Sequence, residues 1–398
     1  MRVAYLLADP GIPVGGTKGA SVHVGEVCRA LAAEGASVTL VAQAVQGAAP
    51  PKVGLLHLDP GPVPSGPTGE PARIEAARDF EQRAASALAE IEPDLVYERL
   101  SLFFSGGGEL ARSLRAARLL EVNAPVAAER ERHFGLVRRE VADRHERLAI
   151  EGAHVLAVSV PLAAWALERK AASVEVVTNG VDAARFDPEL RRDEGSELRR
   201  SLCGGDAEVV GFVGSLKPWH GVDVLLEAVR RLKGSRPRLR LLVVGDGPMR
   251  PSLEEFTRRA GLEGVVTFAG AVPYAAVPGH LAALEIATAP FLPAEEFYFS
   301  PLKVVEAMAA GRPVVASRLS TVESMLGGTG VLVEPGDPAA LAAGLDRLLG
   351  DPALARSLGE RARKRCLREL RWDAVARRIL ARVDELSPRA SSRAGSPK

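Results

Sequence analysis

The segment 298–317 contains the residues of this chain whose types and spacing best fit phosphate and ribose chemistry. It predicts a polar loop, a short helix ended by Gly311 and a buried strand Val314–Ser317. A loop that enters a helix at the carboxyl edge of a parallel sheet commonly binds phosphorylated ligands, because backbone N–H groups point at the anion. Lys303 offers positive charge to a diphosphate, and Glu306 can accept hydrogen bonds from a ribose diol. Together these two residues indicate a bound nucleotide.

A second candidate phosphate loop, Gly214–Gly221, follows an expected buried strand and enters another helix. Lys217 and His220 are expected to be cationic donors at a helix amino terminus, where anions are already favoured. The alternative is that Trp219 packs the loop and that Lys217 is only solvated. We favour the functional interpretation, because two basic sites in one half of the chain match one diphosphate.

Two more glycine-rich turns are predicted near helix starts. Gly245-Asp-Gly-Pro248 fits a tight turn beside the same site, in which Asp246 is expected to cap a helix. The loop 9–20, with Gly16, could bring backbone amides to a phosphate or a sugar, and an ordinary turn is the equal alternative. Neither turn matches the dinucleotide fingerprint, which disfavours a nicotinamide oxidoreductase.

Polar residues also end two expected strands of the first half. Glu121 and Asn123 end one strand, and Glu98 and Arg99 end the strand before it. Such residues at a carboxyl edge could bind an acceptor or stabilise a transition state. Turn chemistry is the equal alternative for both pairs.

The elements that must position these residues alternate as strands and helices along nearly the whole chain. This alternation predicts an α/β fold with doubly wound parallel sheets. Two halves of similar size are expected, joined by a polar linker at 182–200, with the ligand in the cleft between them. Ser21 is expected to cap the first helix, and residues 47–71 to form a long surface excursion. One charged helix is expected over 127–149, mainly solvated, with an anionic acceptor or a membrane surface as a less favoured contact.

Composition limits the classes of function. The chain has 398 residues and a net charge of +1, which argues against nucleic acid as the main partner. The three cysteines, Cys28, Cys203 and Cys366, are scattered, which fits a reducing compartment and gives no metal-ligand spacing. The apolar amino terminus is too short for a signal peptide, and no apolar run approaches the roughly 20 residues that span a bilayer. A cytoplasmic protein without a transmembrane segment is expected.

The ordered motifs resemble those of retaining family-4 glycosyltransferases with the GT-B fold, over nearly the whole chain. Besides the first glycine-rich loop with His23, the motifs are Thr178–Asp182, Phe212–Asp223, Val244–Pro248, Val266–Gly270, Tyr298–Ser317 and Val331–Asp337. Each is weak alone, and their joint order and spacing is specific.

The resemblance implies two Rossmann-like domains that face each other across a cleft. Residues 1–187 would bind the acceptor, 188–370 would bind the nucleotide sugar, and 371–386 would form a helix that crosses back, followed by a disordered tail at 387–398. Glu306 matches the ribose-binding glutamate of the family, and Lys217, Lys303 and Glu306 form the expected catalytic set. The expected donor-binding residues are Gly16, Gly214, His220, Gly245, Val272, Tyr298, Ser300, Pro301 and Leu302. The expected acceptor-binding residues are Glu121, Asn123, Glu98 and Arg99.

The chain departs from the family pattern at the donor site. In the family, a glutamate earlier in this segment often contacts the donor sugar. In this chain that position is Tyr298, and Glu295 and Glu296 lie just upstream. The usual arginine and lysine of the diphosphate site fall on Ser215 and His220. Lys217 and Lys303 are expected to restore the lost positive charge.

The expected reaction is a hexosyltransferase-type transfer from a nucleoside diphosphate sugar, with UDP- or GDP-sugars favoured, and with retention at the anomeric carbon. The acceptor is expected to be a sugar, a lipid or a natural-product scaffold. No cofactor, metal or dedicated catalytic base is expected, because no acidic cluster is evident and the leaving diphosphate could accept the acceptor's proton. The alternatives are a nucleotide-sugar epimerase or hydrolase of the same fold, and a non-catalytic nucleotide-binding or scaffold protein.

Overall fold

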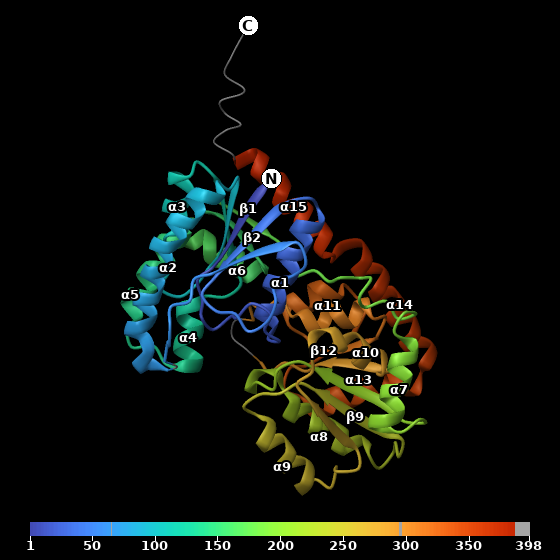
Figure 1. The fold of residues 1–398 in the computed structure, drawn as a ribbon. Helices are drawn as coiled ribbons and strands as arrows, with labels where there is room; N and C mark the ends of the chain where they lie inside the picture. The colour runs from blue at the N-terminus through green and yellow to red at the C-terminus, as the bar shows by residue number, and fades with distance from the viewer. Residues whose placement is uncertain (65, 294–296, 387–398) are drawn as a thin grey trace. The chain divides into compact units, whose positions relative to one another are not determined.

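The computed structural model describes residues 1–64, 66–293 and 297–386. The expected tail at 387–398 and the pair Glu295 and Glu296 lie outside these ranges. Contacts divide the chain into two compact units (Figure 1). Unit 1 comprises Met1–Thr178, Tyr298–Ser300 and the described residues from Trp372 onward, and unit 2 comprises the described residues of Asn179–Phe297 and of Pro301–Arg371.

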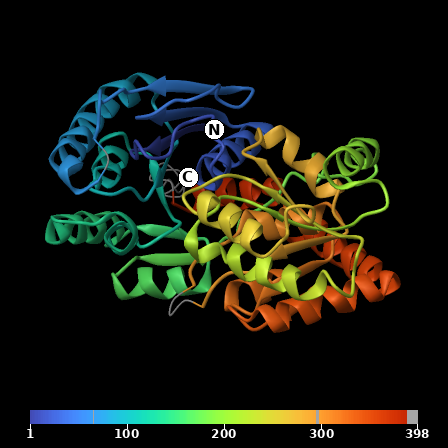
Figure 2. The ribbon, with the colours of Figure 1, turned by 90° about the horizontal axis from the view of Figure 1, so that it is seen from below.

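Unit 1 is built on a sheet of seven parallel strands in the order β3-β2-β1-β4-β5-β6-β7. The strands are β1 (Arg2–Leu7), β2 (Ser37–Ala42), β3 (Val53–His57), β4 (Leu95–Arg99), β5 (Ala117–Val122), β6 (His154–Ala157) and β7 (Ser173–Val176). The central strands are buried along almost their whole length, as expected for a parallel sheet covered on both faces. In Figure 2 the blue strands β1–β3 lie side by side as one twisted layer.

The helices of unit 1 cover this sheet. They are α1 (Gly19–Ala33), α2 (Glu70–Ile91), α3 (Gly107–Ser113), α4 (Val126–Phe134), α5 (Arg139–Ile150), α6 (Val160–Glu168) and α15 (Trp372–Leu386), with a short 3-10 turn η1 (Pro67–Gly69). An apolar core formed mainly by α2, α3 and the strands includes Phe80, Phe104 and Leu88. The last helix, α15, packs against α1 (Figure 1), so the end of the described chain belongs to the same unit as its beginning.

Unit 2 is built on six parallel strands in the order β10-β9-β8-β11-β12-β13. The strands are β8 (Glu208–Val213), β9 (Leu239–Val244), β10 (Val266–Gly270), β11 (Ile286–Ala289), β12 (Val314–Ser317) and β13 (Val331–Val333). The helices are α7 (Arg192–Cys203), α8 (Val222–Leu232), α9 (Arg250–Arg259), α10 (Val277–Ala282), α11 (Leu302–Ala309), α12 (Ser320–Leu326), α13 (Pro338–Gly350) and α14 (Pro352–Glu369), with 3-10 turns η2 (Pro218–His220) and η3 (Tyr274–Ala276). A large core packs α8, α9 and α13 onto the sheet. The two parallel sheets confirm the predicted α/β fold class.

Three sequence-based expectations in unit 1 are wrong. The segment 47–71 contains the strand β3, which pairs in parallel register with β2, and its half-exposed side chains hid the pattern of a buried strand. The segment 127–149 is two helices, because Gly135 has a φ of 75° and ends α4. Ser21 lies inside α1, which begins at Gly19, so it does not cap the helix.

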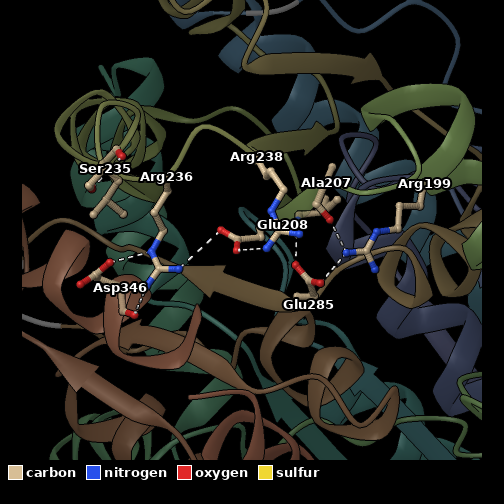
Figure 3. Close-up of polar contacts among 10 residues, drawn as sticks. Arg199, Ala207, Glu208, Ser235, Arg236, Arg238, Glu285 and Asp346 are labelled. Atoms are coloured by element: carbon tan, nitrogen blue, oxygen red, sulfur yellow. Dashed lines mark hydrogen bonds and ion pairs between the residues drawn. The ribbon is translucent and has the colours of Figure 1, made fainter. Parts of the chain in front are cut away.

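The segment 182–200 is not a simple linker, because its second half forms α7. This helix packs closely on α10: a side chain at Gly195 would place its Cβ 2.6 Å from the carbonyl carbon of Ala282. The charged residues of α7 and of the strand starts are paired at the amino edge of the sheet of unit 2 (Figure 3). Arg199 pairs with Glu285, while Glu208 pairs with both Arg236 and Arg238.

In each sheet the order in which successive strands are added reverses once near the centre, while all strands stay parallel. In unit 1 the change lies between β1 and β4, and in unit 2 it lies between β8 and β11. Loops diverge from such a switch point at the carboxyl ends of the strands, which leaves room for a ligand. These two places are therefore where the fold itself positions candidate site residues.

Candidate functional site

Three loops at the carboxyl edge of unit 2 are joined by backbone contacts. Gly214 donates its N–H to the carbonyl of Val244 at 2.9 Å, and Gly245 donates to the carbonyl of Gly270 at 2.7 Å. Gly245 has a φ of 136°, and a Cβ there would lie 1.9 Å from the carbonyl oxygen of Gly214. Only glycine fits such a conformation and such a close approach. The sequence-predicted residues Gly214 and Gly245 therefore form one surface of packed backbone.

Lys303 lies over the switch point of unit 2. Its ammonium nitrogen lies 4.1 Å from the centre of the Phe212 ring in β8 and 5.0 Å from that of Phe291, which follows β11. A Cβ on Gly214 would lie 2.9 Å from the same nitrogen. The nitrogen is buried and has no hydrogen-bond partner among the described residues. Burial lowers the pKa of Lys303 to about 7, although Glu306 opposes the shift.

The prediction that His220 is a cationic donor is wrong for this structure. Burial, followed by the positive charge of Lys303, lowers the pKa of His220 to about 3, although a hydrogen bond to the carbonyl of Ser215 opposes the shift. Because that carbonyl can only accept, Nδ1 of the neutral ring carries the proton and Nε2 is left as an acceptor. Positive charge at this edge therefore comes from lysines rather than from His220.

Lys217 and Trp219 share the loop after β8, as the sequence predicted. The Lys217 ammonium lies 5.7 Å from the centre of the Trp219 ring, and the carbonyl of Trp219 accepts from the N–H of Leu292 at 3.1 Å. Trp219 thus ties this loop to the segment after β11. The packing role weighed for Trp219 is present, and it holds Lys217 at the same edge as Lys303.

The helix α11 carries the remaining predicted donor residues of unit 2. Glu306 is 6% exposed on α11, one turn after Lys303. Pro301 is the residue before the helix, and Leu302 is its half-buried first residue. Val272 lies in the half-exposed turn that follows β10. The structure brings Lys303 and Glu306 together on α11. It places Val272 in the turn after β10, at the same carboxyl edge of the sheet.

The short segment Tyr298–Ser300 belongs to unit 1. Tyr298 packs in an apolar cluster with residues of β5 and α6, and its carbonyl accepts from the hydroxyl of Ser159 at 2.8 Å. Tyr298 is 6% exposed and Ser300 is 7% exposed. These contacts give Tyr298 a packing role, and the donor-binding assignment of both residues stays a prediction.

Gly16 lies in the loop between β1 and α1. This loop is fixed by a backbone bridge between Val14 and Val45, and by a hydrogen bond from Gly16 to the carbonyl of Pro13 at 3.1 Å. A Cβ on Gly16 would lie 2.8 Å from the hydroxyl of Ser21, so the loop is closely packed on the start of α1. Its approach to donor phosphates stays a prediction.

Glu121 is the centre of a buried hydrogen-bond network. It accepts from the hydroxyls of Tyr5 and Tyr97 at 3.0 Å, from Arg99 at 3.3 Å, and pairs with Nε2 of His23 at 2.5 Å. Burial opposes ionisation, but His23, then Arg99 and Tyr5, lower the pKa of Glu121 to about 2. The sequence motif predicted neither this network nor the pairing with His23, because the partners come from separate elements.

The other predicted acceptor residues differ in their surroundings. Glu98 is fully buried and pairs with Arg118, which is the arrangement of a structural ion pair. Arg99 is 7% exposed and is held by Glu121. Asn123 follows β5, and its amide nitrogen is buried without a hydrogen-bond partner in the described part of the chain. Their roles toward an acceptor stay predictions, with the weakest geometric support at Glu98.

Within residues 1–64, 66–293 and 297–386, no three His, Cys, Asp or Glu side chains gather as a metal-binding group. Cys28, Cys203 and Cys366 are free and buried. The helices of the described ranges include none that is long and apolar enough to cross a membrane.

Two family models match consecutive parts of the chain. The model described as Glycosyltransferase Family 4 matches residues 17–185, and the model described as Glycosyl transferases group 1 matches residues 207–351. The first match lies within unit 1 apart from its last residues, and the second lies within unit 2 apart from Tyr298–Ser300.

Similar curated proteins are glycosyltransferases. A D-inositol 3-phosphate glycosyltransferase of Kineococcus radiotolerans is 29% identical, over 100% of this chain and 98% of that protein. An MMP alpha-(1->4)-mannosyltransferase of Mycolicibacterium hassiacum is 32% identical, over 67% of this chain and 63% of its own length. An uncharacterized glycosyltransferase of Methanocaldococcus jannaschii is 29% identical, and the match spans only about half of it, 52%.

Solved structures share the fold over almost the whole chain. Sucrose-phosphate synthase from Thermosynechococcus elongatus superposes with a TM-score of 0.77 at 23% identity, and covers 97% of this chain and 99% of its own. HepE from Anabaena, in complex with UDP-glucose, superposes with a TM-score of 0.76 at 20% identity, over 97% of this chain and 100% of its own.

Proposed function

Because this chain belongs to the family-4 glycosyltransferases with the GT-B fold, we propose that it moves a sugar from a nucleoside diphosphate sugar to an acceptor with retention at the anomeric carbon. Solved neighbours in complex with UDP and with UDP-glucose support a nucleotide sugar as the donor, and UDP- or GDP-sugars are the favoured class. The transferred sugar is proposed to be a hexose. The epimerase, hydrolase and scaffold alternatives are not favoured by these similarities.

The observation that carries this proposal is the position of Lys303. A buried ammonium without a hydrogen-bond acceptor among the described residues lies over the switch point of unit 2, beside the packed loops at Gly214 and Gly245. A lysine beside closely packed glycine loops at the carboxyl end of a parallel strand suits a diphosphate. Without an anion, the same lysine is a buried ammonium that the two aromatic faces and the charge of Glu306 stabilise only in part.

The proposed chemistry is electrostatic. As the glycosidic bond breaks, negative charge develops on the leaving diphosphate, and Lys303 and Lys217 would stabilise that charge. Glu306 would bind the ribose hydroxyls through its carboxylate. The acceptor would attack on the same face from which the diphosphate leaves, and an oxygen of the leaving phosphate would accept the acceptor's proton. The chain's own residues would then position the two substrates and neutralise the diphosphate charge, and none of them would act as the base. Metal independence and a cytoplasmic location belong to the same proposal.

The experiment is a thermal unfolding series of the whole chain with UDP, GDP, ADP, CDP and dTDP, each with and without Mg²⁺. A ligand that binds the folded state at a hundred times its Kd stabilises it by about 2.7 kcal/mol. A shift with one nucleotide, lost in Lys303→Ala, supports the proposal. The absence of a shift with every nucleotide would contradict it. Transfer with the matching nucleotide sugar, and the anomeric configuration of the product by NMR, then test turnover and retention.

A further inference from the structure

Arg73 and Arg130 of unit 1 both donate to carbonyls of the segment that precedes α2, and the positive charge of Arg73 lowers the pKa of Arg130 after burial has lowered it. Arg73 is in the first turn of α2 and donates to the carbonyl of Pro64 at 3.3 Å. Arg130 is in α4 and donates to the carbonyl of Gly66 at 3.0 Å. The guanidinium of Arg130 also stacks over the Phe134 ring at 5.1 Å. Arg73 belongs to no motif that the sequence singles out, whereas Arg130 lies in the charged segment 127–149, for which an anionic acceptor was a less favoured expectation.

Both guanidinium groups have hydrogen-bond capacity left over. The Nε atoms of Arg73 and Arg130 are buried and have no hydrogen-bond partner in the described ranges. Burial, then the positive charge of Arg73, lowers the pKa of Arg130, and Glu70 and Asp9 only partly offset the shift. The carboxylate of Glu70 is itself engaged, because it accepts from the backbone N–H groups of Val137 and Arg138.

The position of Arg73 adds to the positive potential. The amino terminus of a helix carries a partial positive charge, so an arginine in the first turn is electrostatically unfavourable there. A neighbouring like charge makes the arrangement more unfavourable. An arrangement of this kind is relieved by an anion that accepts from both guanidinium groups, and phosphate is the group whose oxygens match their forked donors best.

The arginine pair comes from helices that follow carboxyl ends of strands of unit 1, because α2 follows β3 and α4 follows β5. Asp9 follows β1 and Arg99 ends β4, the two strands that flank the switch point of this sheet. The carboxylate of Asp9 interacts electrostatically with both Arg99 and Arg130. Carboxyl ends of strands at a switch point are where open α/β sheets bind their ligands.

We propose that Arg73 and Arg130 form a phosphate-binding subsite of unit 1, and that the acceptor of the transfer reaction carries a phosphate group. The acceptor role of this phosphate rests on the proposed function, but the phosphate subsite itself does not. Arg99, held by Glu121, lines the same edge, which agrees with its predicted place among the acceptor residues. The phosphate could belong to a sugar phosphate or to a lipid headgroup, which offer the same group to the arginines.

The first test is calorimetric binding of inorganic phosphate to the whole chain. Each protein is also measured in the Lys303→Met background, so that phosphate bound beside Lys303 is recognised whether or not a nucleotide binds. Wild type should bind phosphate, and the double variant Arg73→Gln with Arg130→Gln should bind it at least tenfold more weakly. Arg132→Gln, an exposed arginine of the same α4, is the matched control and should bind as wild type does. No phosphate binding to wild type, or equal binding to the double variant, overturns the subsite.

The second test identifies the source of the phosphate. Matched acceptor pairs, glucose with glucose 6-phosphate and myo-inositol with its monophosphate, are compared with phosphatidylinositol vesicles in transfer assays. Use of a phosphorylated acceptor, with a KM raised at least tenfold in the double variant and unchanged in Arg132→Gln, supports the inference. Equal use of the neutral and the phosphorylated acceptor by wild type, or an unchanged KM for the phosphorylated acceptor in the double variant, contradicts it. Nucleotide binding is measured on every variant, so failure of the donor proposal is seen separately from failure of the arginine subsite.

Discussion

The ammonium nitrogen of Lys303 lies 4.1 Å from the centre of the Phe212 ring and is offered no hydrogen-bond acceptor by any described residue. The two residues come from different elements, α11 and β8, and meet over the switch point of unit 2. A cation–π contact stabilises such a charge by about 2 kcal/mol when it is desolvated. That is less than the several kcal/mol by which desolvation destabilises a buried ion. The lysine is therefore placed at a cost to folding that an anionic ligand would relieve.

Lys303→Met should separate stability from activity. Removing a buried charge without a hydrogen bond should leave the free energy of unfolding of the ligand-free protein unchanged or raise it by about 1 kcal/mol. Turnover of a nucleotide sugar should fall by about 10²–10³-fold, because the group proposed to stabilise the leaving diphosphate is lost. Urea unfolding and steady-state kinetics check the two parts. A variant that is less stable and fully active would contradict both.

Nucleotide binding should be coupled to uptake of a proton by Lys303. Burial lowers its pKa to about 7 in the ligand-free protein, and a bound diphosphate must raise it, because the anion favours the ammonium form. At pH 8 the free lysine is therefore mainly neutral, and binding should weaken as the pH rises above 7. Calorimetry in buffers with different ionisation enthalpies measures the protons taken up. Lys303→Met should abolish that uptake, and an unchanged proton count would remove Lys303 from the diphosphate site.

The same lysine should affect the pH dependence of folding. Between pH 7 and its ordinary pKa of 10.5, an unfolded chain binds a proton at Lys303 that the folded chain does not. The unfolded state then binds more protons, so the contribution of this group to stability rises with pH across that interval. The difference in unfolding free energy between wild type and Lys303→Met, measured at pH 7 and pH 9, should therefore shift in favour of wild type at pH 9. A constant difference would mean that the pKa of Lys303 is not lowered.

Glu121→Gln should destabilise unit 1 strongly. Arg99, which is only 7% exposed, would lose the carboxylate of Glu121 with which it pairs. Breaking such a buried ion pair costs about 3–5 kcal/mol. Tyr5→Phe, which removes one hydroxyl donor to the same carboxylate, should cost only about 1 kcal/mol. Because the folded pKa of Glu121 is lowered to about 2 from 4.5, its contribution is complete above pH 4.5 and is lost as the pH falls toward 2. Urea unfolding of both variants at pH 7 checks the order, and equal losses would contradict the central role of Glu121.

Gly245→Ala should disrupt the packed loops of unit 2. Its Cβ would lie 1.9 Å from the carbonyl oxygen of Gly214, at a φ of 136°. Backbone strain of about 1–3 kcal/mol and overpacking of about 1–3 kcal/mol should add, and nucleotide binding should be lost. Gly234→Ala is the matched control, because nothing lies within 4 Å of a Cβ there. Thermal unfolding with and without nucleotide checks both variants, and similar behaviour of the two would contradict the close packing.

Much of the fold and of the candidate site at the carboxyl edge of unit 2 could be predicted from local sequence. Buried apolar runs and turn residues predicted most strands and helices, since these depend on periodicity within short segments. The motif around Lys303 and Glu306 indicated anion and ribose chemistry, because residue type and position in a loop or helix can be read from the sequence. The edge strand β3 was missed, because its half-exposed side chains carry little periodic signal.

Only the tertiary structure decides which charged and polar side chains from distant segments lie next to one another. The neutral state of His220 depends on burial and on Lys303, which is far away in the sequence. The network around Glu121 gathers Tyr5, His23 and Tyr97 from three other elements. The arginine pair Arg73 and Arg130 comes from separate helices. Residue types are local properties of a sequence, but pKa values and ligand sites depend on desolvation and on Coulomb interactions through space, and these exist only once the chain has folded.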